Sequence, residues 1–251
     1  MESLSVKNIT KEFDGKLALD NVSFQVNPGE FLSILGPSGC GKTTMLRILI
    51  GLLEPTSGSI IMDNKDITHA PPDKRGMGIV FQNYALFENM TVLRNVEYAL
   101  KLKKDTKATA RETALKMIEL VGLSEHISKK PSQLSGGQMQ RVAIARTLAL
   151  SPDIILFDEP MSALDVATRL ALRRELKKIQ AAMGTTMIYI THDQEEAFAM
   201  SDRIMVMNAA TIHQLDTPEE ILRNPADDYV REFVIGNLAE KTASLLKYNI
   251  V

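Results

Sequence analysis

The segment Gly36-Pro37-Ser38-Gly39-Cys40-Gly41-Lys42-Thr43 constrains this chain more than any other part of it. It fits the pattern G-x-x-x-x-G-K-[ST] and stands between an apolar run at 31–35 and a helix-like run at 44–50. A strand, a glycine-rich turn and a helix in this order predict a phosphate-binding loop, because glycine lets backbone N–H groups approach phosphate oxygens. We expect Lys42 to reach the β- and γ-phosphates, and the Thr43 hydroxyl to be a ligand for Mg²⁺.

Length and composition limit the class of protein. The 251 residues suffice for one large α/β domain, and 29 basic against 31 acidic residues argue against a dedicated nucleic-acid surface. The single cysteine, Cys40, excludes an internal disulfide and favours a cytosolic setting, and we interpret it as a small filler of the loop rather than a reactive thiol. The chain contains no signal-peptide pattern and no run of about 18 apolar residues, so any role at a membrane is expected to depend on a partner protein.

The first third of the chain is typical of short strands separated by turns. Strand patterns cover 4–9, 17–26, 59–62 and 78–81. Phe13 falls in a polar segment that we predict to be a loop, and its chemistry leaves two interpretations equally open: an aromatic at the edge of the core, or a platform for adenine. Gln82 follows a strand end, where open α/β sheets bind ligands.

Residues 84–150 have a helical character, with helices expected at 91–102, 108–121 and 139–150. We interpret this stretch as a helical insertion in an α/β core. Ser135 is a candidate N-cap, and Gly136 and Gly137 are expected to leave the backbone exposed at a second anion-binding helix start. Either this site serves the ATP of another copy, which implies a head-to-tail dimer, or it is only a flexible, capped helix start.

Two further strands end in candidate catalytic groups. Apolar residues 154–157 predict a buried strand that ends in Asp158 and Glu159, whose side chains are expected on opposite sides of the strand. Asp158 would hold Mg²⁺ and Glu159 would deprotonate an attacking water. His192 follows the strand expected at 185–190 and would contact the γ-phosphate. Beyond it we expect a hairpin at 203–214, helices at 217–222 and 227–235, and a loosely held tail from Asn237.

With these motifs in this order, residues 3–236 resemble the ATP-binding subunit of an ATP-binding-cassette (ABC) transporter. The resemblance implies an α/β fold: a P-loop NTPase core with a mostly parallel sheet, an N-terminal antiparallel β subdomain and an α-helical subdomain inserted at about 84–150. It implies one domain over 1–236 and a tail over 237–251. It also implies that Phe13 stacks on adenine, that 36–43 and Thr44 bind ATP, and that Gln82 contacts Mg²⁺. His192 would be a switch histidine. Two further segments would act between copies: a signature sequence that contacts the ATP of the other copy (Ser135, Gly136, Gly137, Gln138) and a dimer loop (Ser162, Ala163, Leu164, Asp165).

Segment 73–87 resembles one group within this family, the importers of sugars, polyamines, iron(III), sulfate and phosphonates. Segment 216–226 resembles both that group and the importers of quaternary amines. Many of those chains carry a C-terminal β-barrel regulatory domain, which the end of this sequence at Val251 predicts to be absent. Met139 stands where the family usually has glutamine, and Ala209-Ala210 stand where a hairpin turn usually has glycine. Because alanine is strained at positive φ, we expect this turn to take another shape.

The resemblance implies a homodimer that binds two ATP·Mg²⁺ and hydrolyses them, with Lys42, Glu159 and His192 as the catalytic groups. Membrane-spanning permease subunits are expected to dock near Gln82 to Tyr98, and an extracytoplasmic solute-binding protein to act indirectly. The chain is expected at the cytoplasmic face of the membrane, as a peripheral subunit that binds no nucleic acid. The alternatives are an ATPase of DNA maintenance or translation, and a plain nucleotide-binding switch or kinase.

Overall fold

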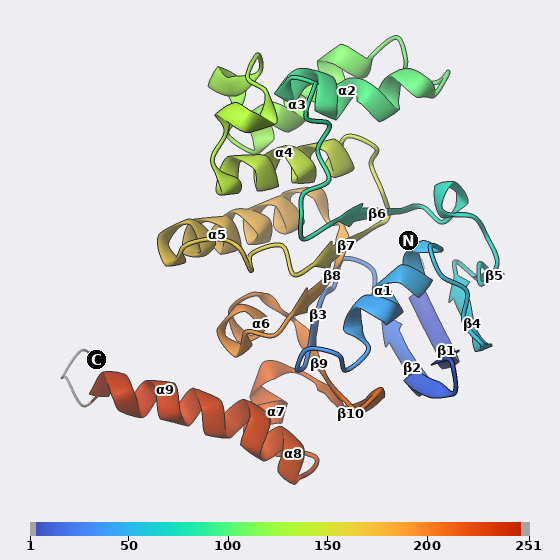
Figure 1. Cartoon of the computed structure of the whole chain (residues 1–251), viewed down its shortest axis with the longest axis vertical. Coiled ribbons are helices and arrows are strands. Elements are labelled where there is room, and N and C mark those ends of the chain that lie inside the picture. Colours follow the sequence, from blue (N-terminus) through green and yellow to red (C-terminus); the bar gives the residue numbers. More distant parts are fainter. Residues whose placement is uncertain (1–3, 247–251) are drawn as a thin grey trace. The chain divides into compact units, whose positions relative to one another are not determined.

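The computed structural model describes residues 4–246, which divide into two compact units (Figure 1). Of the described residues, the first unit comprises 4–71 and 188–246, and the second comprises 72–187. The phosphate-binding loop and His192 belong to the first unit, whereas Gln82, Ser135 and Glu159 belong to the second. Each unit therefore carries its own part of the expected site.

An antiparallel sheet forms the N-terminal part of the first unit. In the described chain its strand order is β2-β1-β4-β5, with β1 at Leu4–Phe13, β2 at Lys16–Val26, β4 at Ser57–Met62 and β5 at Lys65–Asp66. This confirms the antiparallel β subdomain. The loop predicted for Phe13 is wrong: Phe13 is the last residue of β1 and pairs with Lys16. The turn needs only Asp14 and Gly15, both at positive φ, so the strands continue to its edge.

The core strands of the first unit carry the phosphate-binding loop and His192 at their ends. They run in the order β10-β9-β3-β8, with β3 at Phe31–Leu35, β8 at Thr186–Thr191, β9 at Arg203–Asn208 and β10 at Thr211–Asp216. Strand β3 pairs in parallel with β9, and β10 pairs antiparallel with β9. Every residue of β3 and β8 is buried, as in strands that are covered on both faces. Helices α1 (Lys42–Ile50) and α6 (Gln194–Met200) follow β3 and β8.

The hairpin between β9 and β10 has a turn with two residues at positive φ, although alanine is unfavourable in that conformation. Ala209 has a φ of 43° and Ala210 a φ of 69°, so both residues are left-handed and the expected change of turn shape is wrong. This turn matches the right-handed twist of the flanking strands. The Ala210 carbonyl accepts a hydrogen bond of 2.9 Å from the Asp20 amide, which ties the turn to β2 and helps to hold it.

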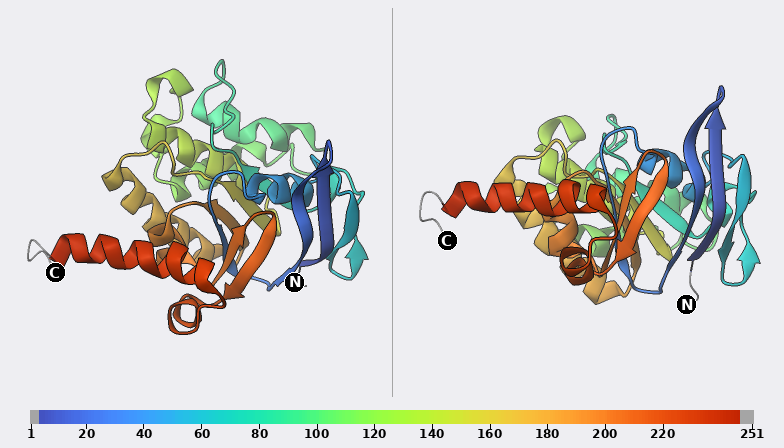
Figure 2. Two further views of the ribbon diagram at one scale, coloured as in Figure 1. Left: turned by 60° about the horizontal axis from the view of Figure 1, so that its bottom comes forward. Right: turned by 90° about the horizontal axis from the view of Figure 1, so that it is seen from below.

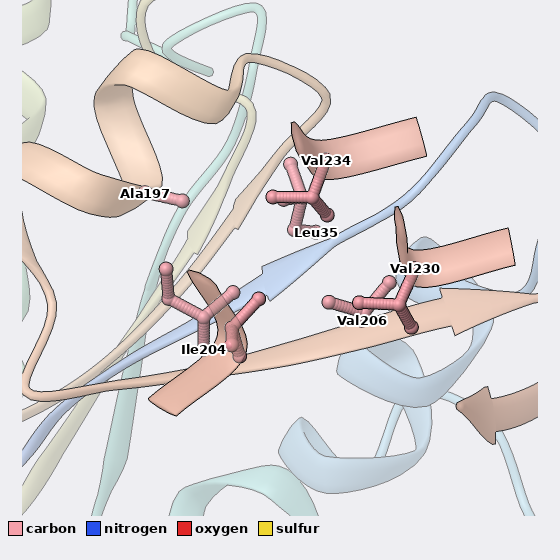
Figure 3. Close-up of a cluster of buried hydrophobic side chains, with 7 residues drawn as sticks. Leu35, Ala197, Ile204, Val206, Val230 and Val234 are labelled. Atoms are coloured by element: carbon pink, nitrogen blue, oxygen red, sulfur yellow. The ribbon is translucent and has the colours of Figure 1, made fainter. Parts of the chain in front are cut away.

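The C-terminal helices of the first unit pack on the end of the core sheet. They are α7 (Pro218–Arg223), α8 (Asp228–Val230), a π-helical turn η4 (Arg231–Gly236) and α9 (Asn237–Leu246). Figure 3 shows Val230 and Val234 beside Leu35 of β3 and Val206 of β9 in one buried apolar cluster. Figure 2 shows the helices in red continuing from the orange β9–β10 hairpin.

Two predictions for this region are therefore wrong. The helix predicted to end at residue 235 continues, and the loosely held tail from Asn237 is a helix as far as Leu246. The partly buried side chain of Leu238 packs against the apolar cluster, which explains why the helix persists past the π-helical turn. Residues 247–251 of the predicted tail lie outside the described part of the chain.

The second unit contains two parallel strands and the helical stretch. Strand β6 (Met77–Val80) pairs with β7 (Ile154–Asp158). The helices are α2 (Val92–Leu102), α3 (Ala110–Leu120), α4 (Gly136–Leu148) and α5 (Val166–Met183), with single 3₁₀ turns η1 (Pro72–Lys74), η2 (Ser124–His126) and η3 (Pro131–Gln133). Helices α2, α3 and α4 pack on one another. Residues 84–150, all of which the structure describes, contain helices and no strand, as predicted.

Of the helices within residues 4–246, none is both long and apolar enough to cross a membrane.

Candidate nucleotide-binding site

The phosphate-binding loop joins β3 to α1 in the first unit. A Cβ built on Gly36 would lie 2.3 Å from the Met207 carbonyl oxygen, and one on Gly41 would lie 2.4 Å from that of Ala18. Gly41 also has a φ of 108°, which other residues rarely adopt. These two positions therefore require glycine, and they fix the path of the loop at both ends.

Lys42 lies along the inside of this loop. Its ammonium group donates hydrogen bonds to the carbonyl oxygens of Gly36 at 2.7 Å and Pro37 at 2.8 Å, and its side chain is buried. Helix α1 begins at Lys42 itself, and its first turn carries no acidic residue that would neutralise its positive end. The loop thus combines an ammonium group with a helix N-terminus, the two features that favour a bound phosphate.

The other residues predicted in this loop differ in exposure. Ser38 and Gly39 are exposed, Pro37, Thr43 and Thr44 are half-buried, and Cys40 is 4% exposed. The buried thiol agrees with a filler role for Cys40. Phe13 is 45% exposed, and the Lys11 ammonium lies 5.0 Å from the centre of its ring. An exposed ring leaves room for a stacked base, and the adenine contact stays a prediction.

His192 is exposed on the turn from β8 to α6, and the residues around it hold that turn. Asp193 caps α6, its carboxylate accepting from the Glu195 amide at 2.8 Å, and its own amide donates to Thr191 Oγ1 at 3.0 Å. Hydroxyl groups of Tyr189 and Thr191 each donate to the buried Glu196 carboxylate at 2.8 Å. This network fixes the backbone on both sides of His192. No local sequence pattern points to Glu196, because its partners Tyr189 and Thr191 lie on the preceding strand.

The strand β7 ends at Asp158, and Glu159 leaves it in a left-handed conformation with a φ of 44°. The prediction that the two carboxylates alternate across a strand is therefore wrong, since Glu159 is no longer in the strand. A bulky residue at positive φ is strained, and such strain gathers at functional sites. The Glu159 carbonyl accepts hydrogen bonds from the Ser162 amide at 3.3 Å and the Ser162 hydroxyl at 3.0 Å, which stabilise the turn.

Gln82 lies just beyond β6, as predicted, and contacts the predicted dimer loop. Its amide nitrogen donates to Ser162 Oγ at 3.1 Å. Ser162 and Ala163 are exposed, Leu164 is buried, and Asp165 caps α5. The Asp165 carboxylate accepts from Thr168 Oγ1 at 2.6 Å and the Thr168 amide at 3.0 Å, and these bonds lower its pKa. Gln82, Ser162 and Glu159 therefore form one hydrogen-bonded group within the second unit.

The predicted signature segment forms the start of α4. Ser135 is exposed and is the N-cap: its hydroxyl accepts from the Gln138 amide at 3.3 Å, and Gln138 Oε1 accepts from the Ser135 amide at 2.9 Å. This reciprocal pair is a capping box. The expectation that both glycines are exposed is wrong for Gly137, which is buried, and a Cβ built on it would lie 2.5 Å from Thr168 Cγ2. Gly137 is thus required for packing against α5.

The predicted magnesium ligands have suitable chemistry. The Thr43 hydroxyl, the Gln82 amide oxygen and the Asp158 carboxylate are hard oxygen donors. Within residues 4–246 no three His, Cys, Asp or Glu side chains form a metal-binding group. Mg²⁺ at a nucleotide is commonly bound through one or two carboxylates together with phosphate oxygens and water.

Fold and loops together define the class: an α/β protein with a P-loop NTPase core. Comparison with known proteins identifies the family within this class. The model of the family described as ABC transporter matches residues 19–162, more than half of the chain. This chain belongs to the ABC transporter family.

Two curated relatives illustrate the similarity. The chain is 48% identical over 231 residues to the spermidine/putrescine import ATP-binding protein PotA of Marinobacter nauticus, covering 92% of this chain and 62% of the relative. It is 51% identical over 233 residues to the sulfate/thiosulfate import ATP-binding protein CysA 2 of Chromobacterium violaceum, covering 93% and 63%. The chain therefore spans somewhat less than two thirds of the length of these relatives.

Solved structures share the fold. The dimeric structure of the ATP-binding cassette MJ0796 in a post-hydrolysis state bound to ADP and Pi superposes with a TM-score of 0.75 at 38% identity, covering 85% of this chain and 98% of that one. The structure of cbiO1 from Clostridium perfringens, part of the ABC transporter complex cbiONQ, gives a TM-score of 0.83 at 28% identity, covering 96% and 98%. These similarities confirm the predicted fold class.

Proposed function

We propose that this chain is the ATP-binding and ATP-hydrolysing subunit of a membrane importer, and that two copies act as a head-to-tail homodimer. The observation that carries the proposal is a pair of helix starts. Both α1 and α4 begin at a glycine-rich turn, and neither has an acidic residue in its first turn. Each is suited to an anion, yet one ATP in one chain needs only the start that carries Lys42. The start at Ser135 then serves the ATP of the other copy.

In this dimer each ATP lies between two copies. Residues 36–44 of one copy surround its phosphates, and the exposed ring of Phe13 stacks on its adenine. Ser135, Gly136, Gly137 and Gln138 of the other copy face the γ-phosphate. The dimer loop, Ser162 to Asp165, lies at the interface. Nucleotide binding closes the dimer because the phosphates contact both helix starts, and hydrolysis removes that contact and opens it.

Three side chains of the chain are assigned to hydrolysis. Lys42 contacts the β- and γ-phosphates, Glu159 accepts a proton from the attacking water, and His192 orients the γ-phosphate. Mg²⁺, held by Thr43, Gln82 and Asp158, would supply positive charge that offsets the charge of the phosphates. The domain organisation that goes with this proposal is a single ATPase domain over 1–236.

The importer assignment draws on the names of the relatives, which are import ATP-binding proteins, and these favour transport over a role in DNA maintenance or translation.

Permease subunits would dock near Gln82 to Tyr98, where the rings of Phe87 and Tyr98 lie 4.7 Å apart and are 37% and 39% exposed. The subunit would be peripheral at the cytoplasmic face, and a solute-binding protein would act through the permease. The two relatives are named for different cargoes, spermidine/putrescine and sulfate/thiosulfate.

The catalytic assignment is tested with Glu159→Gln. General bases contribute about 10²- to 10⁴-fold to a rate, so turnover of Mg·ATP should fall by at least about 100-fold. ATP binding should persist, and light scattering should detect a dimer with Mg·ATP. The exposed Glu119 of α3 provides a control, because Glu119→Gln removes a similar charge and should leave turnover unchanged. Turnover of Glu159→Gln near the wild-type rate would reject Glu159 as the base.

The shared site is tested with Ser135→Arg. This variant should bind ATP as a monomer but neither dimerise nor hydrolyse it. Thr217→Arg is a matched control: Thr217 is also an exposed N-cap, and its hydroxyl accepts from the Glu220 amide at 3.2 Å, much as Ser135 accepts from Gln138. Both changes remove a helix cap, but only one alters the proposed ATP contact. Equal turnover in the two variants would reject the head-to-tail dimer.

A further inference from the structure

The segment between Gln82 and α2 contains two consecutive residues in a left-handed conformation. Tyr84 has a φ of 62° and Ala85 a φ of 47°, and neither is glycine. Left-handed conformations are unfavourable for residues with a Cβ, and two in succession persist only where surrounding contacts hold them. The chain here must therefore be fixed from outside the segment.

Arg146, near the end of α4, makes that contact. Its Nη1 donates to the Ala85 carbonyl at 2.7 Å and its Nη2 to the Tyr84 carbonyl at 3.1 Å. Its guanidinium carbon lies 5.7 Å from the centre of the Phe87 ring. Burial lowers the pKa of this guanidinium from its usual value, which indicates that the contact is partly removed from water. The planar fork of arginine suits two neighbouring carbonyls in a way that the single ammonium of lysine does not.

A continuous series of contacts leads from Arg146 to the site. The Tyr84 amide donates to the Phe81 carbonyl at 3.0 Å, which closes the turn that carries Gln82. Gln82 in turn donates to Ser162 at 3.1 Å. The same helix α4 begins at the signature segment, where a Cβ on Gly136 would lie 3.4 Å from the Tyr84 hydroxyl oxygen. The segment thus touches α4 at both ends, and all of these residues lie within the second unit.

We propose that Arg146 is a positioning residue for ATP hydrolysis: it holds the left-handed Tyr84–Ala85 turn against α4 and so fixes Gln82 relative to the signature segment. The proposal rests on the proposed ATPase function. Because the 13 residues of α4 form one rigid helix, a displacement of Ser135 by the other copy also displaces Arg146 and the turn that Arg146 holds. The turn and the signature segment then move as one body when the other copy engages.

Exposed Ala85 allows the turn to be altered without touching the core. Ala85→Gly should keep kcat within about twofold, because glycine adopts the left-handed conformation readily. Ala85→Val should lower kcat about tenfold with little change in the KM for ATP, because a β-branched residue disfavours that conformation. Arg146→Lys should lower kcat to a similar degree, and adding Ala85→Gly to it should restore part of the loss. The control is Arg174→Lys at an exposed position of α5, which should behave as wild type.

Hydrogen exchange of the amides at 84–90, measured without nucleotide, provides a readout independent of turnover. It should speed up at least tenfold in Arg146→Lys and in Ala85→Val, and not in Arg174→Lys. Unchanged exchange, an unchanged kcat in both variants, or no rescue by Ala85→Gly would overturn the proposal. Wild-type protein without ATPase activity would instead overturn the proposed function, while the exchange experiment would still test the Arg146 contact.

Discussion

Gln82 and Glu159 are linked through one hydroxyl group. The Gln82 amide donates to Ser162 Oγ at 3.1 Å, and Ser162 Oγ donates to the Glu159 carbonyl at 3.0 Å. Both bonds lie within the second unit, and they connect the residue expected to contact Mg²⁺ with the residue expected to act as base. The hydroxyl of Ser162 therefore helps to hold Glu159 at its strained positive φ, a role that the exposed position of Ser162 does not suggest.

Ser162→Ala removes both of these bonds without adding bulk. A typical hydrogen bond contributes about 0.5–1.5 kcal/mol net, with the lower end expected at an exposed site, so kcat should fall about three- to tenfold. The KM for ATP should stay within about twofold, because no group that contacts the nucleotide is lost. Steady-state ATPase assays measure both constants. Ser128→Ala, at another exposed position of the second unit, is the control, and a kcat for Ser162→Ala equal to wild type would exclude this role.

Gly137→Ala is expected to destabilise the protein, against the usual trend. In a helix, alanine is normally favoured over glycine by about 1 kcal/mol. Here the new Cβ would lie 2.5 Å from Thr168 Cγ2, and that methyl cannot rotate away because Thr168 Oγ1 donates to Asp165 at 2.6 Å. Overpacking of this kind costs about 1–3 kcal/mol, so the net change should be a loss.

The second variant of this experiment removes the clash. Thr168→Ser deletes the methyl and keeps the hydroxyl that bonds Asp165, so Gly137→Ala should be tolerated in that background. Urea unfolding of the four proteins of this double-mutant cycle gives the coupling free energy. A destabilisation by Gly137→Ala that is equal in both backgrounds would show that Thr168 is not the obstacle.

The sequence predicted best those features that depend on local pattern. The buried strand before Gly36, the capping of α4 by Ser135 and the position of Gln82 beyond β6 all follow from spacing and residue type, and the structure confirms each. The positive φ of Glu159 could not be predicted, because no propensity favours glutamate there and tertiary contacts impose it.

Contacts between distant segments were also beyond prediction. Arg146 bonds carbonyls 61 and 62 positions away, and a single sequence gives no sign of which arginine on a helix faces which turn. Gly137 was interpreted as an exposed glycine, since its neighbour Thr168 belongs to another helix. The wrong prediction for the C-terminal tail has a similar cause, because Leu238, near the start of α9, packs on a cluster whose members come from the core sheet, from α6, α7 and α8, and from the π-helical turn η4.

The β9–β10 hairpin offers a stabilising change. Ala209 is exposed at a φ of 43°, a conformation that asparagine tolerates much better than alanine. Ala209→Asn should therefore raise the free energy of unfolding by about 0.5–1 kcal/mol, with no change in ATPase rate. Ala171→Asn, at an exposed position inside α5, is the matched control and should destabilise, because asparagine is a poorer helix former. Thermal unfolding compares the two, and a lower Tm for Ala209→Asn would contradict the strain assigned to this turn.

The contacts of the Asp227 carboxylate predict a pH dependence of stability. Asp227 caps α8, and its carboxylate accepts from the Val230 amide at 2.8 Å and contacts His213 Nδ1 at 2.6 Å. The Val230 hydrogen bond chiefly, and then His213, lowers the pKa of Asp227. A carboxylate with a lowered folded-state pKa stabilises the protein fully above its unfolded pKa of about 3.9, and this contribution is lost as the pH falls through the lower folded value.

Asp227→Asn should isolate that contribution, since asparagine caps a helix about as well as aspartate but carries no charge. At pH 7 the variant should have a lower urea midpoint than wild type, and the difference should shrink as the pH falls below the unfolded pKa of about 3.9. The control, Asp228→Asn, changes a neighbouring carboxylate whose side chain is 99% exposed and 3.7 Å from Arg231, and its effect should be small at every pH, as for exposed ion pairs. A difference for Asp227→Asn that is constant from pH 7 to pH 3 would show that the charge of Asp227 does not stabilise the fold.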